Sequence, residues 1–239
     1  MVNSILNSLF PSYCYLCELR TDSALPLCSS CQLNLARNRN YCDRCALPFP
    51  SAISKNLATL CPKCQLRPPS FSRVVAPWLY DEQMAFLIHR WKFQGEKQLT
   101  VVLANLWLST WENSRHIDLI VPVPLHWRRL WHRGFNQAEL LARKIHAIAP
   151  DLHNTDIDVK RVTRTRATES QSGLSATGRG DNLNGVFDSK KKCEGMHIAV
   201  VDDVMTTGST AEALSKCLLK AGAKSVEIWC IARTPAPLQ

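Results

Sequence analysis

Apolar and polar positions follow different patterns in the two parts of the chain. Residues 1–67 show little periodic hydrophobicity, whereas strand-like and helix-like apolar patterns alternate along the remainder. Such alternation predicts an α/β fold, in which helices flank a parallel sheet. The sequence RPPS, which begins at Arg67, favours an extended backbone and disfavours helix. We therefore expect a small module over residues 1–67 and an α/β domain over residues 68–239.

Four segments of the expected domain carry apolar residues at helical spacing, and five shorter runs are strand-like. The expected helices are residues 82–93, 99–111, 135–149 and 211–221, and the expected strands are residues 73–80, 117–123, 156–163, 196–201 and 225–232. Gly222 suits the left-handed conformation that ends the last helix. Residues 164–185 are polar and have no apolar period, which predicts a long exposed loop. Long loops inside compact domains are usually functional.

Composition and the lack of targeting signals indicate the cellular compartment in which the protein is expected. With 46% hydrophobic and 21% charged residues, the chain has the composition of a globular protein. It has no apolar run long enough for a transmembrane helix, and its N-terminus lacks the basic region of a signal peptide. We expect a cytoplasmic location with no membrane span. Eight of the eleven cysteines precede residue 65 in four Cys-x2-Cys pairs, which in a reducing compartment are typical of metal ligands.

These eight cysteines predict two structural zinc ions. The first set has the spacing x2-x10-x2 and the second the spacing x2-x15-x2, and four thiolates complete a tetrahedral zinc shell. The sets are Cys14, Cys17, Cys28 and Cys31, and Cys42, Cys45, Cys61 and Cys64. Sequential pairing is favoured, and crossed pairing between the sets stays open. A redox role is disfavoured because redox Cys-x2-Cys motifs normally occur singly near a βαβ unit.

A phosphate-binding loop is predicted at residues 200–211, VVDDVMTTGSTA, where a strand meets the start of a helix. Gly208 permits close approach of a phosphate, and hydroxyl donors follow from Thr206, Thr207, Ser209 and Thr210. The acids Asp202 and Asp203 can accept hydrogen bonds from ribose hydroxyls and help to hold a hydrated magnesium ion. The plainer alternative, an acidic turn before a helix cap, needs only one acid and one hydroxyl.

A second anion-binding segment is predicted at residues 121–145, which read VPVPLHWRRLWHRGFNQAELLARKI. We expect a loop that leads into a helix and presents Arg128, Arg129, Arg133, Gly134, Asn136 and Gln137. Arginine pairs well with phosphate oxygens, and the helix start adds N–H donors, so this segment can hold pyrophosphate. A solvated basic face is the alternative.

The loop at residues 200–211 is similar to the phosphoribosyl-pyrophosphate motif of type I phosphoribosyltransferases. It lacks the lysine of a nucleoside-triphosphate P-loop and the pattern GxGxxG. Residues 161–187 resemble the mobile flap of that superfamily, and Thr168, Gln171 and Arg179 resemble the pattern of amidophosphoribosyltransferases. Together with the cysteine pairs and the VPVP to RGFNQ segment, these motifs resemble the ComF/GntX family over nearly the whole chain.

The family resemblance implies a double zinc ribbon followed by a type I phosphoribosyltransferase-like domain. It implies that phosphoribosyl pyrophosphate or a related nucleotide binds with magnesium, that Asp202 and Asp203 are the catalytic acids and position the ribose, and that Gln171 contacts the ligand. In bacteria it also implies a requirement during natural transformation, when incoming single-stranded DNA reaches the cytoplasm. Single-stranded DNA and proteins of the DNA-uptake machinery are then the expected partners.

The formal net charge of +9 leaves a second class of function in view. Clustered lysine and arginine attract phosphates, whether of a nucleotide or of nucleic acid, although a basic surface can also be inert. Trp127 and Trp131 lie among arginines, and a base stacked on an aromatic ring contributes about 1–3 kcal/mol. A non-catalytic sensor of the nucleotide sugar, or a module that binds single-stranded DNA, is therefore the alternative to an enzyme.

Overall fold

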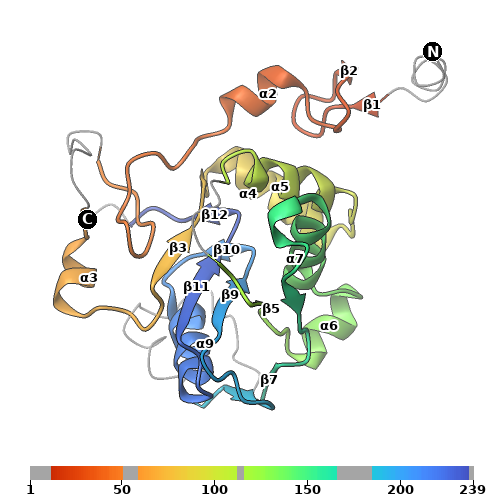
Figure 1. The fold of residues 1–239 in the computed structure, drawn as a ribbon. Coiled ribbons are helices and arrows are strands. Elements are labelled where there is room, and N and C mark those ends of the chain that lie inside the picture. Colours follow the sequence, from red (N-terminus) through yellow and green to blue (C-terminus); the bar gives the residue numbers. More distant parts are fainter. Residues whose placement is uncertain (1–11, 51–58, 112–115, 166–184, 237–239) are drawn as a thin grey trace.

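A parallel sheet of five strands forms the centre of the fold (Figure 1). The computed structural model describes residues 12–50, 59–111, 116–165 and 185–236. The strands lie in the order β3 (Arg73–Val75), β11 (Ser225–Trp229), β9 (His197–Val201), β5 (Leu119–Pro122) and β6 (Asp156–Ile157), and all neighbouring pairs are parallel. Each of the five expected strands contributes to this sheet, which confirms the predicted α/β class.

Helices cover both faces of the sheet. Three lie on one face and one on the other: α4 (Glu82–Phe93), α5 (Leu99–Leu108) and α7 (Gln137–Ile148), and then α9 (Ser209–Lys220). In β9, Ala199 and Val201 pack with the first group, whereas Ile198 and Val200 pack with α9. Successive side chains of a strand point to opposite faces, so an uninterrupted apolar strand is what a doubly covered sheet requires. None of the described helices is long and apolar enough to cross a membrane.

The expected strand at residues 73–80 is split in two. β3 belongs to the central sheet, whereas β4 (Trp78–Leu79) joins a separate parallel sheet with β12 (Ala232–Arg233) and β10 (Val204–Met205). Pro77 lies between β3 and β4 and has no backbone N–H, so it cannot continue the ladder of the central sheet. The prediction of one continuous strand is therefore wrong here.

The expected strand at residues 156–163 is also split. β6 ends where Asp158 Oδ1 accepts a hydrogen bond from the backbone N–H of Lys160 at 3.0 Å, a turn that aspartate commonly forms. The chain then enters β7 (Val162–Arg164), which pairs antiparallel with β8 (Phe187–Ser189). β7 and β8 therefore form a short ribbon outside the central sheet.

The N-terminal module packs on the α/β domain in several places. Its elements are β1 (Ser12–Tyr13), β2 (Arg20–Thr21), α2 (Ser29–Asn34) and α3 (Pro62–Leu66). Leu27 and Leu35 are buried in the same apolar core as helices α4 and α5. Farther along, the Arg44 guanidinium donates hydrogen bonds to the carbonyl oxygens of Pro69 at 3.2 Å and Phe71 at 3.3 Å. Because the apolar cores are shared, a domain boundary between residues 67 and 68 stays a proposal.

Candidate functional site

The eight cysteines of the N-terminal module gather in two separate groups. Within each group the four sulfur atoms lie within 4.8 Å of one another. One group contains Cys14, Cys17, Cys28 and Cys31, and the other contains Cys42, Cys45, Cys61 and Cys64. The described cysteines therefore follow the sequential pairing and not the crossed one. Four thiolates in so small a space fit a tetrahedral structural zinc ion, and two such groups fit the two predicted ions.

Backbone hydrogen bonds favour the thiolate form of Cys14, one member of the first group. Burial raises the pKa of the Cys14 thiol, but hydrogen bonds from the backbone N–H groups of Cys28, Cys17 and Leu16 outweigh burial and lower this pKa to about 6. The thiolate is the form that binds zinc. The fold of the ribbon thus prepares the sulfur atom for the metal.

The predicted phosphate loop follows directly after the central strand β9. Gly208 has a φ angle of 80° and is the N-cap of α9, which begins at Ser209. The hydroxyl oxygens of Thr207 and Ser209 lie 2.9 Å apart. A hollow of about 40 Å³, lined mainly by residues 204–211, lies at the start of the helix and exceeds the ~10–15 Å³ that a water molecule needs. The first N–H groups of a helix have no partner within the helix, so this hollow suits a phosphate.

Two details of this loop differ from the sequence prediction. Residues 200–211 are expected to form a loop, but β10 (Val204–Met205) lies within them and pairs with β12. In addition, α9 begins at Ser209 and not at Ala211. The cause of the first difference is β12, which comes from a distant part of the chain and supplies backbone hydrogen-bonding partners that no local pattern reveals.

The two acids at the end of β9 have different surroundings. Asp203 Oδ1 lies 2.7 Å from Nζ of Lys92 on α4, in an ion pair whose side chains are 18% and 17% exposed. Burial, together with the neighbouring Asp203 carboxylate, raises the pKa of Asp202 to about 7. The backbone N–H of Asp202 donates to the carbonyl oxygen of Trp229 at 2.8 Å, which fixes the acid at the edge of the sheet. A cation bound beside Asp202 would favour its charged form.

Two arginines, together with Lys92, bring positive charge to these acids. Burial lowers the pKa of both Arg133 and Arg164, whereas the Asp203 carboxylate favours the charged form of Arg133, and that of Asp202 favours the charged form of Arg164. Arg133 belongs to the predicted pyrophosphate segment. Lys92 lies outside every motif in the sequence, because a lysine within a helix gives no distinctive signal. Arg164 lies within the predicted flap segment, residues 161–187, but it is not among the residues predicted to bind the ligand.

The predicted pyrophosphate segment is partly helical. α6 (Trp127–Arg133) replaces the expected loop, with the His126 side chain capping its start and Gly134 ending it in the left-handed conformation. A cap residue at each end stabilises this short helix. The apolar pattern of the sequence did not indicate it. Arg128 is exposed, and its guanidinium lies 5.3 Å from the centre of the Trp127 ring. The expected loop is therefore wrong for these residues.

Asn136 and Gln137 are placed at the start of α7. The Asn136 side chain accepts a hydrogen bond from the backbone N–H of Ala138 and donates one to the carbonyl oxygen of Val123, both at 3.1 Å. Gln137 is buried, with 1% of its surface exposed. In the described structure Asn136 thus ties the segment to Val123, directly after β5. Outside the described residues lie Thr168, Gln171 and Arg179.

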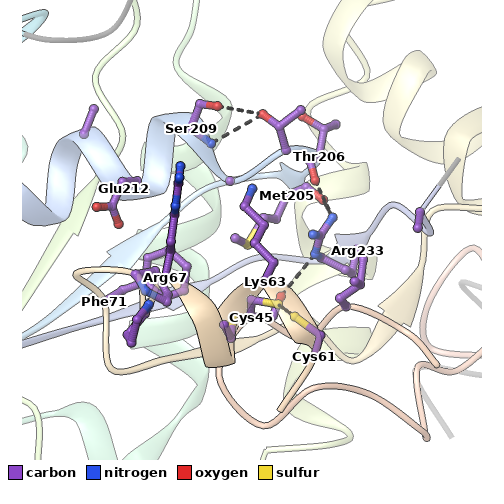
Figure 2. A pocket seen from close by; sticks show the side chains of 18 of the residues that line it. Cys45, Cys61, Lys63, Arg67, Phe71, Met205, Thr206, Ser209, Glu212 and Arg233 are labelled. Carbon is purple, nitrogen blue, oxygen red and sulfur yellow. Dashed lines mark hydrogen bonds between the residues drawn. The ribbon is translucent and has the colours of Figure 1, made fainter. Parts of the chain in front are cut away.

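Arg233 connects the second cysteine group with the phosphate loop (Figure 2). It is buried, and its guanidinium donates hydrogen bonds to the carbonyl oxygens of Cys45 at 3.1 Å, Met205 at 2.9 Å and Thr206. A zinc ligand and two loop residues thus share one cation. The sequence gives no indication of this contact, because the arginine follows an apolar run and its partners are backbone atoms far away in the chain.

The fold and site define a two-part protein, in which two four-cysteine groups accompany an α/β domain with a phosphoribosyltransferase-like phosphate loop. A model of the double zinc ribbon domain matches residues 5–65, and a model of the phosphoribosyl transferase domain matches residues 130–238. The chain belongs to the ComF/YhgH family, whose members combine these two domains.

Two relatives in this family match over most of their length. The DNA utilization protein YhgH of Escherichia coli O157:H7 is 36% identical over 233 residues, which cover 94% of this chain and 98% of that protein. Competence protein F of Haemophilus influenzae is 36% identical over 216 residues, which cover 87% and 90%. Among solved structures, a purine phosphoribosyltransferase from Pyrococcus horikoshii matches 59% of this chain and 75% of its own, at 17% identity and a TM-score of 0.33.

The two four-cysteine groups predict separable zinc sites. The native protein should bind two zinc ions, and Cys14→Ser and Cys61→Ser should each remove one, because a structural site needs all four thiolates. Zinc released per chain, measured with a chromogenic chelator, tests this. Full chelation should unfold the ribbons, since each ion contributes on the order of 10 kcal/mol. Cys217→Ser, outside both groups, should keep both ions. A native protein without zinc would contradict the prediction.

The raised pKa of Asp202 predicts a pH-dependent stability. A carboxyl whose pKa is about 7 in the folded state and roughly 4 when unfolded stabilises the fold fully below about pH 4. This contribution is lost as the pH rises from about 4 through about 7, because the unfolded state releases the proton first and the folded state disfavours a charge on this partly buried carboxyl beside Asp203. Asp202→Asn cannot ionise, so its free energy of unfolding relative to the native protein should increase between about pH 5 and pH 8. Denaturant titrations measure this difference. Asp156→Asn, at an exposed acid, is the control. If the difference in free energy of unfolding between Asp202→Asn and the native protein did not change with pH, the raised pKa of Asp202 would be refuted.

Proposed function

We propose that the chain binds phosphoribosyl pyrophosphate with magnesium at the carboxyl end of β9. The 5′-phosphate lies on residues 206–210, and the ribose hydroxyls contact Asp202 and Asp203. The pyrophosphate lies toward Arg133 and Arg164. The observation that carries this proposal is the meeting, at one sheet edge, of two acids, a helix start with Gly208 as its cap, and half-buried cations. One ligand with a vicinal diol and two phosphate ends satisfies all three.

The acid pair also suits magnesium. Carboxylate oxygens are the ligands that this ion prefers, and it usually keeps several of its waters while it contacts substrate phosphates. When bound, magnesium supplies charge neutralisation of the pyrophosphate. The chain's own contribution is orientation: Asp203 holds a hydroxyl, Arg133 and Arg164 hold phosphate oxygens, and no covalent intermediate on the protein is needed for displacement at the sugar. Gln171 is a further proposed contact.

We also propose that this binding serves DNA uptake in the cytoplasm. The support comes from the two relatives, whose names describe one as a DNA utilization protein and the other as a competence protein. Their similarity extends over both parts of the chain, so it includes the zinc ribbons as well as the phosphate loop. Incoming single-stranded DNA and proteins of the uptake machinery are the proposed partners.

A second candidate function, direct binding of single-stranded DNA, is favoured by one observation. Trp127 and Trp131 on α6 are 65% and 88% exposed. Large aromatic side chains are seldom left so exposed without a partner, and Arg128 and Arg129 lie on the same short helix. Stacked bases and paired phosphates would cover both kinds of side chain. The two functions are compatible, because α6 follows β5 and lies beside the proposed pyrophosphate site.

Asp203→Asn should weaken binding of phosphoribosyl pyrophosphate with magnesium by about tenfold or more, because the amide cannot replace a charged acceptor. Isothermal titration in excess magnesium measures the change. Asp156→Asn, which alters an exposed acid on β6, should bind as the native protein does. Equal affinity of Asp203→Asn and native protein would overturn the assignment of this acid, and a native protein that does not bind the ligand would overturn the proposed function.

Trp131→Ala should weaken binding of a short oligodeoxythymidine by about 5- to 150-fold, which corresponds to the loss of one stacked base at ~1–3 kcal/mol. Fluorescence anisotropy at increasing salt measures affinity, and the affinity should fall steeply with ionic strength if several phosphates are contacted. Phe86→Ala removes another exposed ring, on α4, and serves as the matched control. Binding that is insensitive to both Trp131 and salt would exclude this surface.

A further inference from the structure

A cavity of about 610 Å³ lies between the second cysteine group and the phosphate loop (Figure 2). Sites for small molecules commonly measure about 300–1,000 Å³. The apolar part of its wall includes Leu47, Pro69, Phe71, Met205, Ala213 and Pro235. Neither Asp202 nor Asp203 lines the cavity. The cavity is therefore distinct from the proposed ribose site at Asp202 and Asp203. The cavity and that site have in common only residues of the phosphate loop.

The rim of this cavity is positively charged. Lys63 and Arg67 lie on the ribbon side, opposite Glu212 of α9 (Figure 2). The Glu212 carboxylate is already occupied, because it accepts hydrogen bonds from the backbone N–H and the hydroxyl of Ser70 at 2.8 Å and pairs with Lys216 at 3.2 Å. In the described part of the chain, no carboxylate lies within 4.0 Å of Lys63 or Arg67.

Arg233 adds a buried positive charge to the same wall. Its described partners are carbonyl oxygens, which offset the charge of a guanidinium less than a carboxylate does. A zinc ion with four thiolates carries a charge of about −2, which compensates part of this excess. The four cations of the cavity still outnumber the charges of Glu212 and the zinc group together. The field in the cavity thus favours an anion that also has an apolar part.

We propose that this cavity binds a nucleoside monophosphate. The flat base lies against the apolar wall at Phe71 and Pro69, and the phosphate lies between Lys63, Arg67 and Lys216. A planar ring gains free energy from an apolar wall, and the arginine fork matches phosphate oxygens. The bound nucleotide and phosphoribosyl pyrophosphate would then occupy opposite sides of the loop at residues 206–209.

Adenosine 5′-monophosphate is a suitable probe, titrated calorimetrically into the full-length zinc-bound protein. Saturating ribose 5-phosphate is included so that the phosphate loop is filled and only the cavity stays open. Combined Lys63→Gln and Arg67→Gln should weaken binding about tenfold or more through the loss of two charged contacts. Ala213→Phe should abolish binding by filling the apolar part. Lys160→Gln, at an exposed lysine beside β7, is the matched control and should bind as the native protein does.

Three results would overturn the proposal: absence of binding to the native protein, displacement of the nucleotide by ribose 5-phosphate, and unchanged affinity of the Lys63 and Arg67 double variant. Zinc content and thermal unfolding verify that each variant is folded. Lys63 and Arg67 are both exposed, so the double variant should fold and bind zinc as the native protein does. If ribose 5-phosphate fails to bind while the nucleotide binds with the expected dependence on Lys63 and Arg67, the phosphate-loop function fails and the cavity site stands.

Discussion

The pairing of β9 with a parallel strand on each side is the constraint on which the rest of the structure depends. β11 pairs with β9 along its whole length, and β5 pairs with it from Ile198 to Val201, so the chain leaves the sheet at one fixed edge. Asp202 and Asp203 stand at that edge because of this pairing. Apolar packing on both faces of β9 thereby positions the two acids, and the proposed ligand site lies where the strand ends.

The cysteine-rich module is built into this arrangement and is not an appendage. Its first part places Leu27 and Leu35 in the same core as α4 and α5. Its second part is linked to the phosphate loop through Arg233, which donates hydrogen bonds to the carbonyl oxygens of both Cys45 and Met205. A segment with so few apolar residues cannot stabilise itself by burial alone. The two parts of the chain therefore depend on each other, since the ribbons complete the apolar cores of the domain and the domain supports the ribbons.

Features that depend on local patterns were predictable from the sequence, and features that depend on distant contacts were not. Helical periodicity gave α4 and α7, and cysteine spacing gave both four-cysteine groups. The split after β3 came from Pro77, a local signal that the longer apolar run obscured. The ion pair of Lys92 with Asp203 and the hydrogen bond from Arg233 to Cys45 each join residues more than a hundred positions apart in sequence, so only the fold brings them together.

The ion pair between Lys92 and Asp203 makes ligand binding at this edge an exchange of partners. The carboxylate that is proposed to receive a sugar hydroxyl is already neutralised by an ammonium group 2.7 Å away. A ligand has to offer that ammonium a new anion as it takes the carboxylate, and a phosphorylated sugar can do both. A bare inorganic cation can do only half of this exchange. At the proposed site, the ion pair would therefore favour binding of magnesium together with a phosphate over binding of magnesium alone.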